Sequence, residues 1–525
     1  MKIDERIFMF FCQGLSLTLK NGNQIINDFN MVLNNGDKLA LMGEEGSGKS
    51  TLLKFIYDSR LIDSYCFYKG STNLEKLSIA YLPQTIENHW LNFSAIEFLA
   101  HETIDSEFDY ETYNHLFDIE QWFDYLLLDK TLLDETRKIS TLSGGEKIKL
   151  QLVKILRKHP KLILLDEPTN DLDISTLEVF EQLMNRIETP IIFISHDETL
   201  LTNVATQILH LEQIKHQKLA KFHYEKMGYQ TYVEYRQRQI EQHNRKAYRT
   251  KKEQEKRRQI LMHQHLLVEN DLDRASGQSP AEGRILAKKM KNIKSQEKRL
   301  SEMEVVDYYK QEEQMNLFFD DQVSLPKGKV ILDLHLDELR VGHRRLAGQI
   351  DIKIVGPEHV FIIGPNGSGK TTLIRHILEG LEKTKNIRIG YMPQNYEEGF
   401  DITISPVAYL QSKLGYDTKM KSQIMTFLAV LNFIEEEMNS PIHTLSGGLK
   451  AKLYLLEMVM NKYDVLLLDE PTRNLSPLSS PTVIDMLNKF KGALIVVTHS
   501  RMLLSAVSST TYLLSEGSFI KNHTN

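Results

Sequence analysis

GEEGSGKS at residues 43–50 and GPNGSGKT at residues 364–371 are the stretches that decide the fold of this chain of 525 residues. Glycines let the backbone wrap closely around phosphate groups, and the lysine near the end of each stretch adds a positive charge. Each loop is followed, in the same order, by a glutamine, an LSGG signature, an apolar strand ending in Asp-Glu, and a histidine. In both copies the signature serine precedes that glutamate by 24 residues, and the glutamate precedes the histidine by 29. Five elements repeated with matching spacing indicate two copies of one phosphate-binding unit.

The residues around each loop predict an α/β nucleotide-binding domain. The apolar runs KLALM at 38–42 and HVFII at 359–363 predict strands that enter the loops, and a helix is expected after each loop. The expected fold class is therefore α/β, with two tandem nucleotide-binding domains joined by an antiparallel α-helical hairpin. The expected bounds are 1–235 for the first domain, 236–305 for the hairpin and 306–525 for the second domain, with 306–323 as a connecting segment.

The chemistry of each motif assigns roles to its residues. The glycines, the lysine and the signature serine would hold ATP, whereas hydroxyls, carboxylates and the glutamine amide would hold Mg²⁺. The glutamate after each buried strand is placed to polarise the attacking water, and the histidine to contact the γ-phosphate. The catalytic candidates are Glu167, Glu470, His196 and His499. The candidates for ATP binding in the first copy are Gly43, Gly46, Ser47, Gly48, Lys49, Ser50, Thr51, Gln84, Ser143, Gly144 and Gly145. Those in the second copy are Gly364, Asn366, Gly367, Ser368, Gly369, Lys370, Thr371, Thr372, Gln394, Ser446, Gly447 and Gly448. The metal candidates are Ser50, Gln84, Asp166, Thr371, Gln394 and Asp469.

Composition narrows the class of protein. Charged residues make up 26% of the chain and hydrophobic ones 41%, which is typical of globular proteins in water. No apolar run approaches the ~18 residues that a membrane-spanning helix needs, so no membrane partner is expected. Only two cysteines occur, Cys12 and Cys66, which favours a reducing cytoplasm over a disulfide scaffold.

The segment between the two copies differs from both in charge. Residues 236–305 hold 18 Lys or Arg and 10 Asp or Glu, although the whole chain has a net charge of −6. A helix over 236–258, a turn at 276–280 and a second helix over 281–304 predict the hairpin. An apolar stripe on the second helix predicts packing of one arm on the other. It consists of Leu286, Met290, Ile293 and Leu300. On the first arm Ile240, Ala247, Ile260, Leu261 and Leu267 fit such a stripe only loosely, and His243, His263 and His265 are expected to be solvated.

The excess of positive charge favours a polyanionic partner for the hairpin. RNA phosphates are the expected ligands of Arg257, Arg258, Lys288, Lys289 and Lys291. The turn around residues 272–280 would then lie deepest in the partner. A purely structural spacer is the competing interpretation.

The complete motif set resembles the ATP-binding cassette superfamily, and two cassettes joined by a charged helical hairpin resemble its ABC-F family. GYQTYVEY at residues 228–235 is similar to a tyrosine-rich stretch that precedes the hairpin in that family. The resemblance implies a Mg²⁺-dependent ATPase that is a monomer with a head-to-tail cassette sandwich around two ATP. It also implies a ribosomal partner, with the hairpin entering the tRNA exit site beside P-site tRNA and pointing along rRNA toward the peptidyl-transferase centre. Protection of ribosomes against antibiotics is favoured slightly over a housekeeping role in translation.

Several residues depart from the family pattern, and in a head-to-tail sandwich three departures fall on the site formed by the first phosphate loop. They are Glu44-Glu45 in that loop, Leu449 at the end of the opposite signature, and Ser476 where the first copy has Asp173. Two acids at close range would each repel triphosphate by ~1 kcal/mol if solvated. The alternative, that both acidic side chains point to water, is equally open. No aromatic residue is evident for stacking on adenine, where alignment places Lys20 and Val341.

Two other classes of protein share parts of this pattern. The ATPase component of a membrane transporter has such cassettes, but does not need a basic hairpin of this length. A DNA-repair or chromosome-structure ATPase pairs cassette heads with coiled coils, although these are usually longer or inserted within a head. Binding to ribosomes, to membranes or to duplex DNA would separate the three classes.

Overall fold

The computed structural model describes residues 10–101, 116–134, 136–169, 172–212, 221–275, 280–302, 319, 325–342, 344–384, 386–515 and 517–522. The chain divides into two compact units, of which one contains Met1–Tyr229 and Glu313–Asn525 and the other contains Gln230–Glu312. Apart from residue 319, the expected connecting segment 306–323 lies outside the described residues. So do Asn170 and Asp171, and residues 276–279 of the expected hairpin turn.

The first cassette is built on a six-stranded sheet in the order β5-β6-β7-β3-β8-β9. Its strands are β3 (Lys38–Met42), β5 (Ile79–Leu82), β6 (Leu162–Asp166), β7 (Ile191–Ile194), β8 (Gln207–Glu212) and β9 (Lys221–Glu225). All pairs are parallel except β8–β9, and β3, β6 and β7 are buried along their whole length, as their apolar sequences predict. A second, antiparallel sheet consists of β1 (Phe10–Leu19), β2 (Gln24–Leu33) and β4 (Cys66–Thr72).

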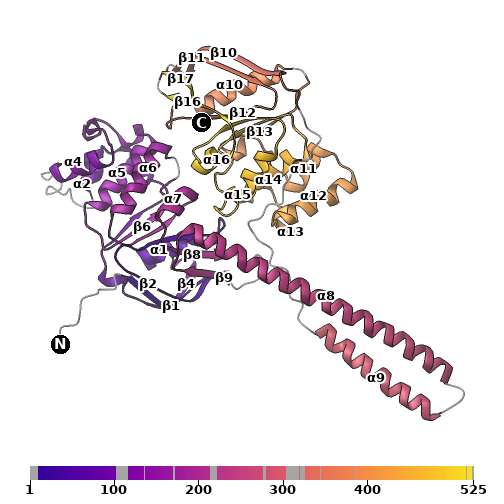
Figure 1. Ribbon diagram of the computed structural model, residues 1–525. Helices are drawn as coiled ribbons and strands as arrows, with labels where there is room; N and C mark the ends of the chain where they lie inside the picture. Colours follow the sequence, from indigo (N-terminus) through magenta and orange to yellow (C-terminus); the bar gives the residue numbers. More distant parts are fainter. Residues whose placement is uncertain are drawn as a thin grey trace, which may run out of the picture. The chain divides into compact units, whose positions relative to one another are not determined.

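The described helices of the first cassette are α1 (Lys49–Tyr57), α2 (Ala95–Ala100), α4 (Leu116–Tyr125), α5 (Gly144–Leu156), α6 (Ile174–Arg186) and α7 (Glu198–Val204). Helices α1 and α5 contact strands of this sheet. Figure 1 shows α2, α4 and α5 gathered in one group away from β1 and β2. The phosphate loop lies between β3 and α1, and the signature begins α5.

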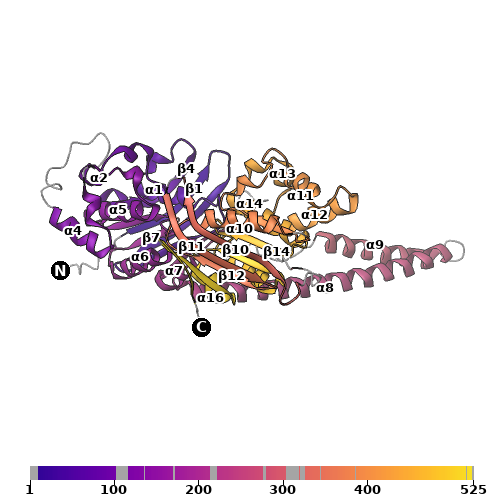
Figure 2. The ribbon, with the colours of Figure 1, turned by 90° about the horizontal axis from the view of Figure 1, so that it is seen from above.

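The second cassette repeats this plan. Its sheet has the order β13-β14-β15-β12-β16-β17, formed by β12 (His359–Ile363), β13 (Ile389–Met392), β14 (Val465–Asp469), β15 (Ala493–Val497), β16 (Thr510–Ser515) and β17 (Ser518–Asn522). An antiparallel pair, β10 (Val330–Val341) and β11 (Arg344–Val355), lies beside α10 (Figure 2). The helices are α10 (Lys370–Glu382), α11 (Pro406–Leu414), α12 (Thr418–Val430), α13 (Glu435–Asn439), α14 (Gly447–Met460), α15 (Ser480–Lys489) and α16 (Arg501–Ala506). Corresponding strands carry corresponding motifs, so the internal repeat in the sequence is a structural repeat.

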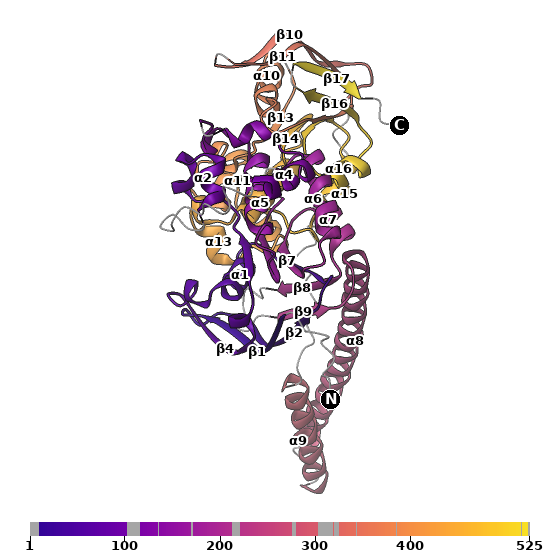
Figure 3. The same cartoon turned by 90° about the vertical axis from the view of Figure 1, so that its left-hand side faces the viewer.

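The hairpin consists of α8 (Tyr229–Ala275) and α9 (Pro280–Glu302), which lie side by side in opposite directions (Figure 3). With 47 residues, α8 is ~70 Å long at 1.5 Å per residue. The predicted stripe on α9 is the less exposed face of that helix, and Ile293 is its most buried member.

The structure corrects the expected stripe on α8. Ile260 and Leu267 are 49% and 51% exposed, so they do not belong to the seam. Leu261, His265 and Val268 are the less exposed positions of this stretch. The expectation that His265 is solvated is wrong, because its Nδ1 lies 2.9 Å from the Glu297 carboxylate on α9. A polar pair takes a seam position there, which is why apolar periodicity alone misread the register.

Two further expectations from composition concern membranes and cysteines. In the part of the chain that the structure describes, no helix is both long and apolar enough to cross a membrane. Cys12 and Cys66 are both buried and unbonded to each other, and burial raises the pKa of each thiol.

Candidate nucleotide-binding sites

The two phosphate loops have the same internal geometry. Lys49 Nζ donates to the carbonyls of Gly43 and Glu44 at 2.8 and 2.9 Å. Lys370 Nζ donates to Gly364 and Pro365 at the same distances, 2.8 and 2.9 Å. Burial lowers the pKa of both lysines, while the carboxylates of the neighbouring motifs act in the opposite direction. Backbone carbonyls thus hold each lysine inside its loop. A bound phosphate could replace these carbonyls as the hydrogen-bond partner of the lysine.

The first glycine of each loop is required by close packing. A Cβ atom on Gly43 would overlap a backbone carbonyl of β8, and one on Gly364 would overlap a carbonyl of β16. Gly48 and Gly369, with φ of 95° and 98°, cap the helices that follow. This left-handed conformation favours glycine and turns the first amides of α1 and α10 toward the loop, where phosphate binds.

In the first copy the acidic pair is already hydrogen-bonded to its expected partners. Asp166, at the end of β6, accepts from the Ser50 hydroxyl at 3.0 Å and from Tyr81 at 3.1 Å. The Gln84 amide donates to Glu167 at 2.8 Å, and His196 Nε2 lies 3.4 Å from the same carboxylate. The structure therefore brings together four motifs of the first copy that are far apart in the sequence: the phosphate loop, the glutamine, the acidic pair and the histidine. Tyr81 was not among the sequence candidates, because a tyrosine on a strand gives no signal of its own.

The acidic pair of the second copy is more deeply buried. Burial, with repulsion from Asp469, raises the pKa of Glu470 to about 7, and burial raises that of Asp469 to about 6. Burial and the charge of Lys370 lower the pKa of His499 to about 4. The His499 backbone N–H donates to Glu470 at 3.3 Å, and its Nε2 lies 3.7 Å from the other carboxylate oxygen.

The residues at the end of β14 fit a bound Mg²⁺ ion. Asp469 is 1% exposed, and neither carboxylate oxygen makes a hydrogen bond of normal geometry among the described residues. A buried carboxylate without such partners is costly unless a cation or proton joins it. The Thr371 hydroxyl lies beside it and lowers its pKa. The described residues contain no cluster of three or more His, Cys, Asp or Glu that could hold a metal alone. Mg²⁺ that is bound together with phosphate usually has only one or two carboxylate ligands from the protein.

A cavity of about 550 Å³ joins the second phosphate loop to the first signature. Lys370, Thr371, Glu470 and His499 line it, and Gly144 of the other cassette lines it too. Asp173, which caps α6 of the first cassette, acts electrostatically on both Lys370 and His499. The second site is therefore assembled head-to-tail, from the loop of one cassette and the signature of the other.

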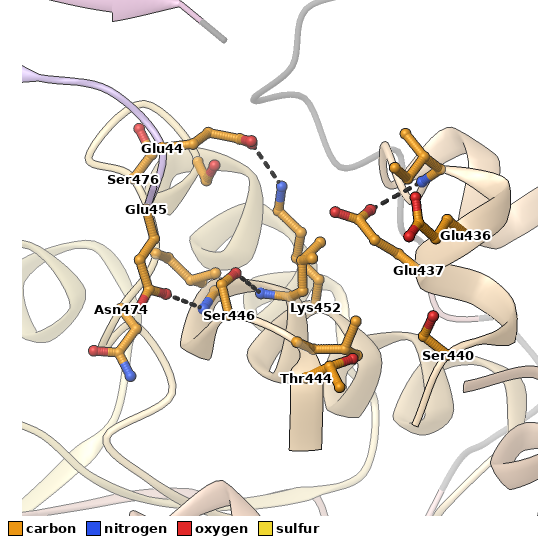
Figure 4. Close-up of a pocket in the computed structure, with 16 residues that line it drawn as sticks. Glu44, Glu45, Glu436, Glu437, Ser440, Thr444, Ser446, Lys452, Asn474 and Ser476 are labelled. Carbon is orange, nitrogen blue, oxygen red and sulfur yellow. Dashed lines mark hydrogen bonds and ion pairs between the residues drawn. The ribbon is translucent and has the colours of Figure 1, made fainter. Parts of the chain in front are cut away.

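At the first site the two loop acids reach the opposite signature (Figure 4). Glu45 accepts a hydrogen bond from the Gly448 amide at 2.9 Å, and Glu44 forms an ion pair with Lys452 at 2.8 Å. They line a cavity of about 520 Å³ together with the divergent residues Leu449 and Ser476. The alternative that Glu44 and Glu45 point to water is therefore wrong. The sequence could not reveal these contacts, because more than 400 positions separate the partners.

The family profile that matches this chain is that of the ABC transporter family, over residues 26–170 and 347–473, more than half of the sequence. This chain belongs to the ATP-binding cassette family. Within it, the relatives and the paired cassettes place the chain among the ABC-F proteins. The chain is accordingly an ATPase of that family.

Three relatives illustrate the similarity along nearly the whole ABC-F chain. Ribosome protection protein VmlR of Bacillus subtilis is 28% identical, over 95% of this chain and 85% of VmlR. ATP-binding protein Uup of Buchnera aphidicola is 27% identical, over 95% of this chain and 79% of its own length. ATP-binding cassette sub-family F member 2 of Mus musculus is 25% identical, over 97% and 80% of the two chains.

Solved structures share the fold of this ABC-F chain. RNase-L Inhibitor superposes with a TM-score of 0.54 at 17% identity, covering 95% of this chain and 87% of its own. The archaeal ribosome recycling factor aABCE1, solved with the stalk protein aP1, has a TM-score of 0.53 at 18% identity, covering 92% and 85%. At such identities the likeness concerns the fold alone.

Contacts between the cassettes that the sequence did not predict surround the two sites. His196 Nδ1 lies 2.7 Å from the Leu475 carbonyl of the second cassette. Arg501 of α16 binds Glu181 at 2.8 Å and Asp197 at 3.1 Å. A cavity of about 120 Å³ is lined by both histidines, His196 and His499. The two ATP sites of this ABC-F chain therefore share an interface that both histidines face.

One of the two residues that alignment places beside adenine lines the cavity of the second site. Val341 lines the cavity, as the alignment placed it, and so does Arg344 on the adjoining strand. A guanidinium plane can stack on a base, so Arg344 is a candidate that a search for aromatic residues would miss. Lys20 of the first cassette lies over Phe67, with Nζ 5.8 Å from the ring centroid.

Proposed function

We propose that this chain is a magnesium-dependent ATPase of the cytoplasm whose paired cassettes control the binding of its basic hairpin to the ribosome. The observation that carries the proposal is the row of exposed basic residues along a long rod. On α9, from Arg284 to Arg299, seven Lys or Arg accompany one acid, Glu297. The five residues predicted to contact RNA are all exposed. Such a surface fits the phosphates of folded RNA better than another globular protein.

The cassettes supply the chemistry that would drive the cycle. Lys370 and the amides of its loop would neutralise the β- and γ-phosphates, and Thr371 with Asp469 would hold Mg²⁺, which polarises the phosphates when bound. Glu470 would accept a hydrogen bond from the attacking water, and His499 would position that water against the γ-phosphate. Gly144 at the opposite signature closes the site, so hydrolysis and cassette separation would be coupled.

The hairpin carries a second kind of surface near its turn. Exposed apolar side chains occur on the outer half of α8 and at the start of α9, although a solvated spacer would avoid them. They are Met262, Leu266, Leu267 and Ile285. Unstacked bases or a hydrophobic drug site would offer apolar partners to such side chains. This supports the more specific proposal that the hairpin enters the tRNA exit site, beside P-site tRNA and rRNA of the large subunit, and acts near the peptidyl-transferase centre.

Ribosome protection against antibiotics is the role that we propose within this class. VmlR, which is named a ribosome protection protein, is similar along 95% of this chain. A housekeeping role in translation is the alternative, and an antibiotic susceptibility panel on cells with and without the protein separates the two. A change in susceptibility to drugs of the peptidyl-transferase region supports protection, and unchanged susceptibility with altered growth supports the housekeeping role.

Ribosome pelleting tests the proposed partner. The double variant Glu167→Gln, Glu470→Gln, loaded with ATP and Mg²⁺, should pellet with ribosomes through a sucrose cushion. The same variant without nucleotide, and the wild type with ADP, serve as controls and should remain mostly in the supernatant. Absence of the trapped variant from the pellet, together with retention on duplex DNA or on membrane vesicles, would replace the ribosome by one of those partners.

A further inference from the structure

The two signatures differ in the source of one carboxylate. At the first signature Glu146 accepts hydrogen bonds from the Ser143 amide and hydroxyl, both at 2.8 Å, and so caps its own helix α5. The second signature has Leu449 at that position, and the first turn of α14 contains no acid. Glu45 of the first phosphate loop supplies the missing carboxylate from the other cassette, through the Gly448 amide at 2.9 Å. The start of α14, which has no acid in its own first turn, is thus contacted by a carboxylate of the other cassette.

Glu45 stands where a phosphate would stand in the other site. In a head-to-tail sandwich the signature glycines and the amides at the helix end face the terminal phosphate of the nucleotide. The Glu45 carboxylate occupies this place at α14, and it lies so close to Gly447 that a Cβ there would meet it at 3.2 Å. The second phosphate loop carries Pro365 and Asn366 at the positions of Glu44 and Glu45, and Asn366 lines the open cavity with Gly144.

Glu44 adds a second contact between the first phosphate loop and the signature helix of the second cassette. Glu44 and Lys452, whose side chains are only 14% and 6% exposed, form their ion pair next to the Glu45 contact. A charge pair that has lost most of its water is not screened as surface pairs are, and removing one partner leaves the other buried and unpaired. The lysine at the corresponding position of the first signature is Lys149, and the second phosphate loop has no acid at the positions of Glu44 and Glu45.

The cavity of about 520 Å³ beside the second signature also carries an excess of negative charge. Four carboxylates line it, against the single ammonium group of Lys452. They belong to Glu44, Glu45, Glu436 and Glu437. Of the first phosphate loop only the two acids reach this cavity, whereas at the second site Lys370 and Thr371 face the same cavity as the signature. At the first site the acids, and not the loop lysine, therefore share a cavity with the opposite signature.

We infer that Glu45 takes the place of the γ-phosphate at the second signature, so that the first site closes without a triphosphate and binds a nucleoside diphosphate in preference to a triphosphate. Lys49 and the loop amides remain available for two phosphates, and a third meets the carboxylates. The second site alone then responds to the γ-phosphate. This inference rests on the proposed ATP-dependent function only in that both loops bind adenine nucleotides.

Nucleotide binding to one site at a time tests the preference. Lys370→Ala removes the second site, and titration with fluorescent ADP and with a non-hydrolysable ATP analogue then reports on the first. We expect the variant to bind the diphosphate roughly fivefold more tightly or better, as one like-charge contact of ~1 kcal/mol implies. Adding Glu44→Pro and Glu45→Asn, the residues of the second loop, should reverse this order. Glu45→Gln, which keeps the shape of the side chain, should abolish most of the preference if charge is the cause.

Amide exchange tests the closure itself in the nucleotide-free protein. The Gly448 amide should exchange slowly in the wild type and at least roughly tenfold faster after Glu45→Gln, with thermal melting used to check that the fold is retained. Tighter binding of the ATP analogue by Lys370→Ala, or an unprotected Gly448 amide in the wild type, would overturn the inference and leave the proposed function standing. Failure of both Lys370→Ala and Lys49→Ala to bind any adenine nucleotide would instead contradict the proposed function.

Discussion

At the scale of single residues, the two glutamates after the buried strands show how the fold prepares a reactive group. Glu167 and Glu470 have φ of 50° and 56°, a left-handed conformation that non-glycine residues rarely adopt. It occurs at the same point in both cassettes, directly after the aspartate that ends the strand. Strain of this kind persists only where the surrounding structure over-determines it, typically at functional sites.

Replacing both glutamates by glutamine should stop ATP hydrolysis without stopping ATP binding. The amide keeps the size of the carboxylate but cannot polarise water, so turnover should fall at least ~100-fold. Phosphate release and binding of fluorescent ATP measure the two effects on Glu167→Gln, Glu470→Gln. Undiminished turnover by this variant would show that water is activated by another group.

Glu198 should make the stability of the cassettes depend on pH. Burial raises the pKa of Glu198 from its ordinary value of 4.5 to about 7. The hydrogen bond from the Ser480 hydroxyl lowers this pKa by a smaller amount, and repulsion from Asp197 raises it further. The folded state therefore holds the proton more tightly than the unfolded state does. The penalty for ionising Glu198 is absent below about pH 4.5, grows between pH 4.5 and 7, and is constant above.

Comparison with Glu198→Gln isolates this contribution. The free energy of unfolding of the wild type should fall relative to the variant as the pH rises through that window, by a total on the order of 3 kcal/mol. Urea titrations at several pH values measure the difference. A difference between the two proteins that does not change with pH would show that Glu198 ionises normally in the folded state.

At the scale of elements, the hairpin is held by a seam that leaves most of its basic side chains exposed. Ile293 is buried in this seam, and the contact between His265 Nδ1 and the Glu297 carboxylate at 2.9 Å fixes the register of α8 against α9. Arg257, Arg258 and the three lysines of α9 are exposed. The element is therefore internally packed and yet presents most of its basic residues to solvent.

Reversing the five predicted RNA-contact residues to Glu should weaken ribosome pelleting and flatten its dependence on salt. Each lost phosphate contact should reduce the slope of log affinity against log salt by about one. The matched control exchanges Arg and Lys at the same five positions, which keeps the charge and the helix. Pelleting that ignores both salt and the reversals would refute RNA contact by these residues.

The exposed apolar side chains of the hairpin should be needed for protection of the ribosome but not for binding of the protein to it. Changing Met262, Leu266, Leu267 and Ile285 to Ser should leave ATPase activity and salt-dependent pelleting within about twofold, because the basic residues proposed to contact phosphates are unchanged. Protection of translation in a cell-free assay with a peptidyl-transferase drug should be lost. Full protection by this variant would assign the effect to other residues of the hairpin.

At the scale of the whole chain, the two ATP sites are unequal although their catalytic motifs match. The second site has an open cavity between loop and signature, whereas Glu44 and Glu45 bridge the first. His196 is bound to the Leu475 carbonyl, but His499 Nδ1 has no hydrogen-bond partner among the described residues. At the first site two carboxylates of the phosphate loop thus contact the opposite signature helix directly.

This asymmetry predicts unequal effects of the two single variants. Glu470→Gln should reduce turnover several-fold more than Glu167→Gln, because the second site keeps the expected residues and the room for a triphosphate. Single-turnover hydrolysis by each variant, at saturating ATP, gives the comparison. Equal or reversed losses would show that Glu44, Glu45, Leu449 and Ser476 are tolerated variations.

The sequence by itself determined the fold class and the duplication, and it predicted the residues of each phosphate site. Those features are encoded locally, because a buried apolar strand, a glycine-rich loop and a helix start each have a characteristic sequence pattern. The internal repeat presents each of these patterns twice. The ABC-F assignment followed from the same motifs. The seam of the hairpin was only half predictable, because α9 has an apolar stripe but α8 places His265 in it.

Only the tertiary structure decided what the departures from the pattern mean. In the sequence, Glu44 and Glu45 appear as two negative charges beside a bound phosphate. In the structure, Glu44 pairs with Lys452 and Glu45 accepts a hydrogen bond from the Gly448 amide of the other cassette. Repulsion within one loop and attraction across an interface depend on the same charges but on different distances. Those distances join residues of opposite cassettes, and no local pattern in a single chain records which distant residues come within reach.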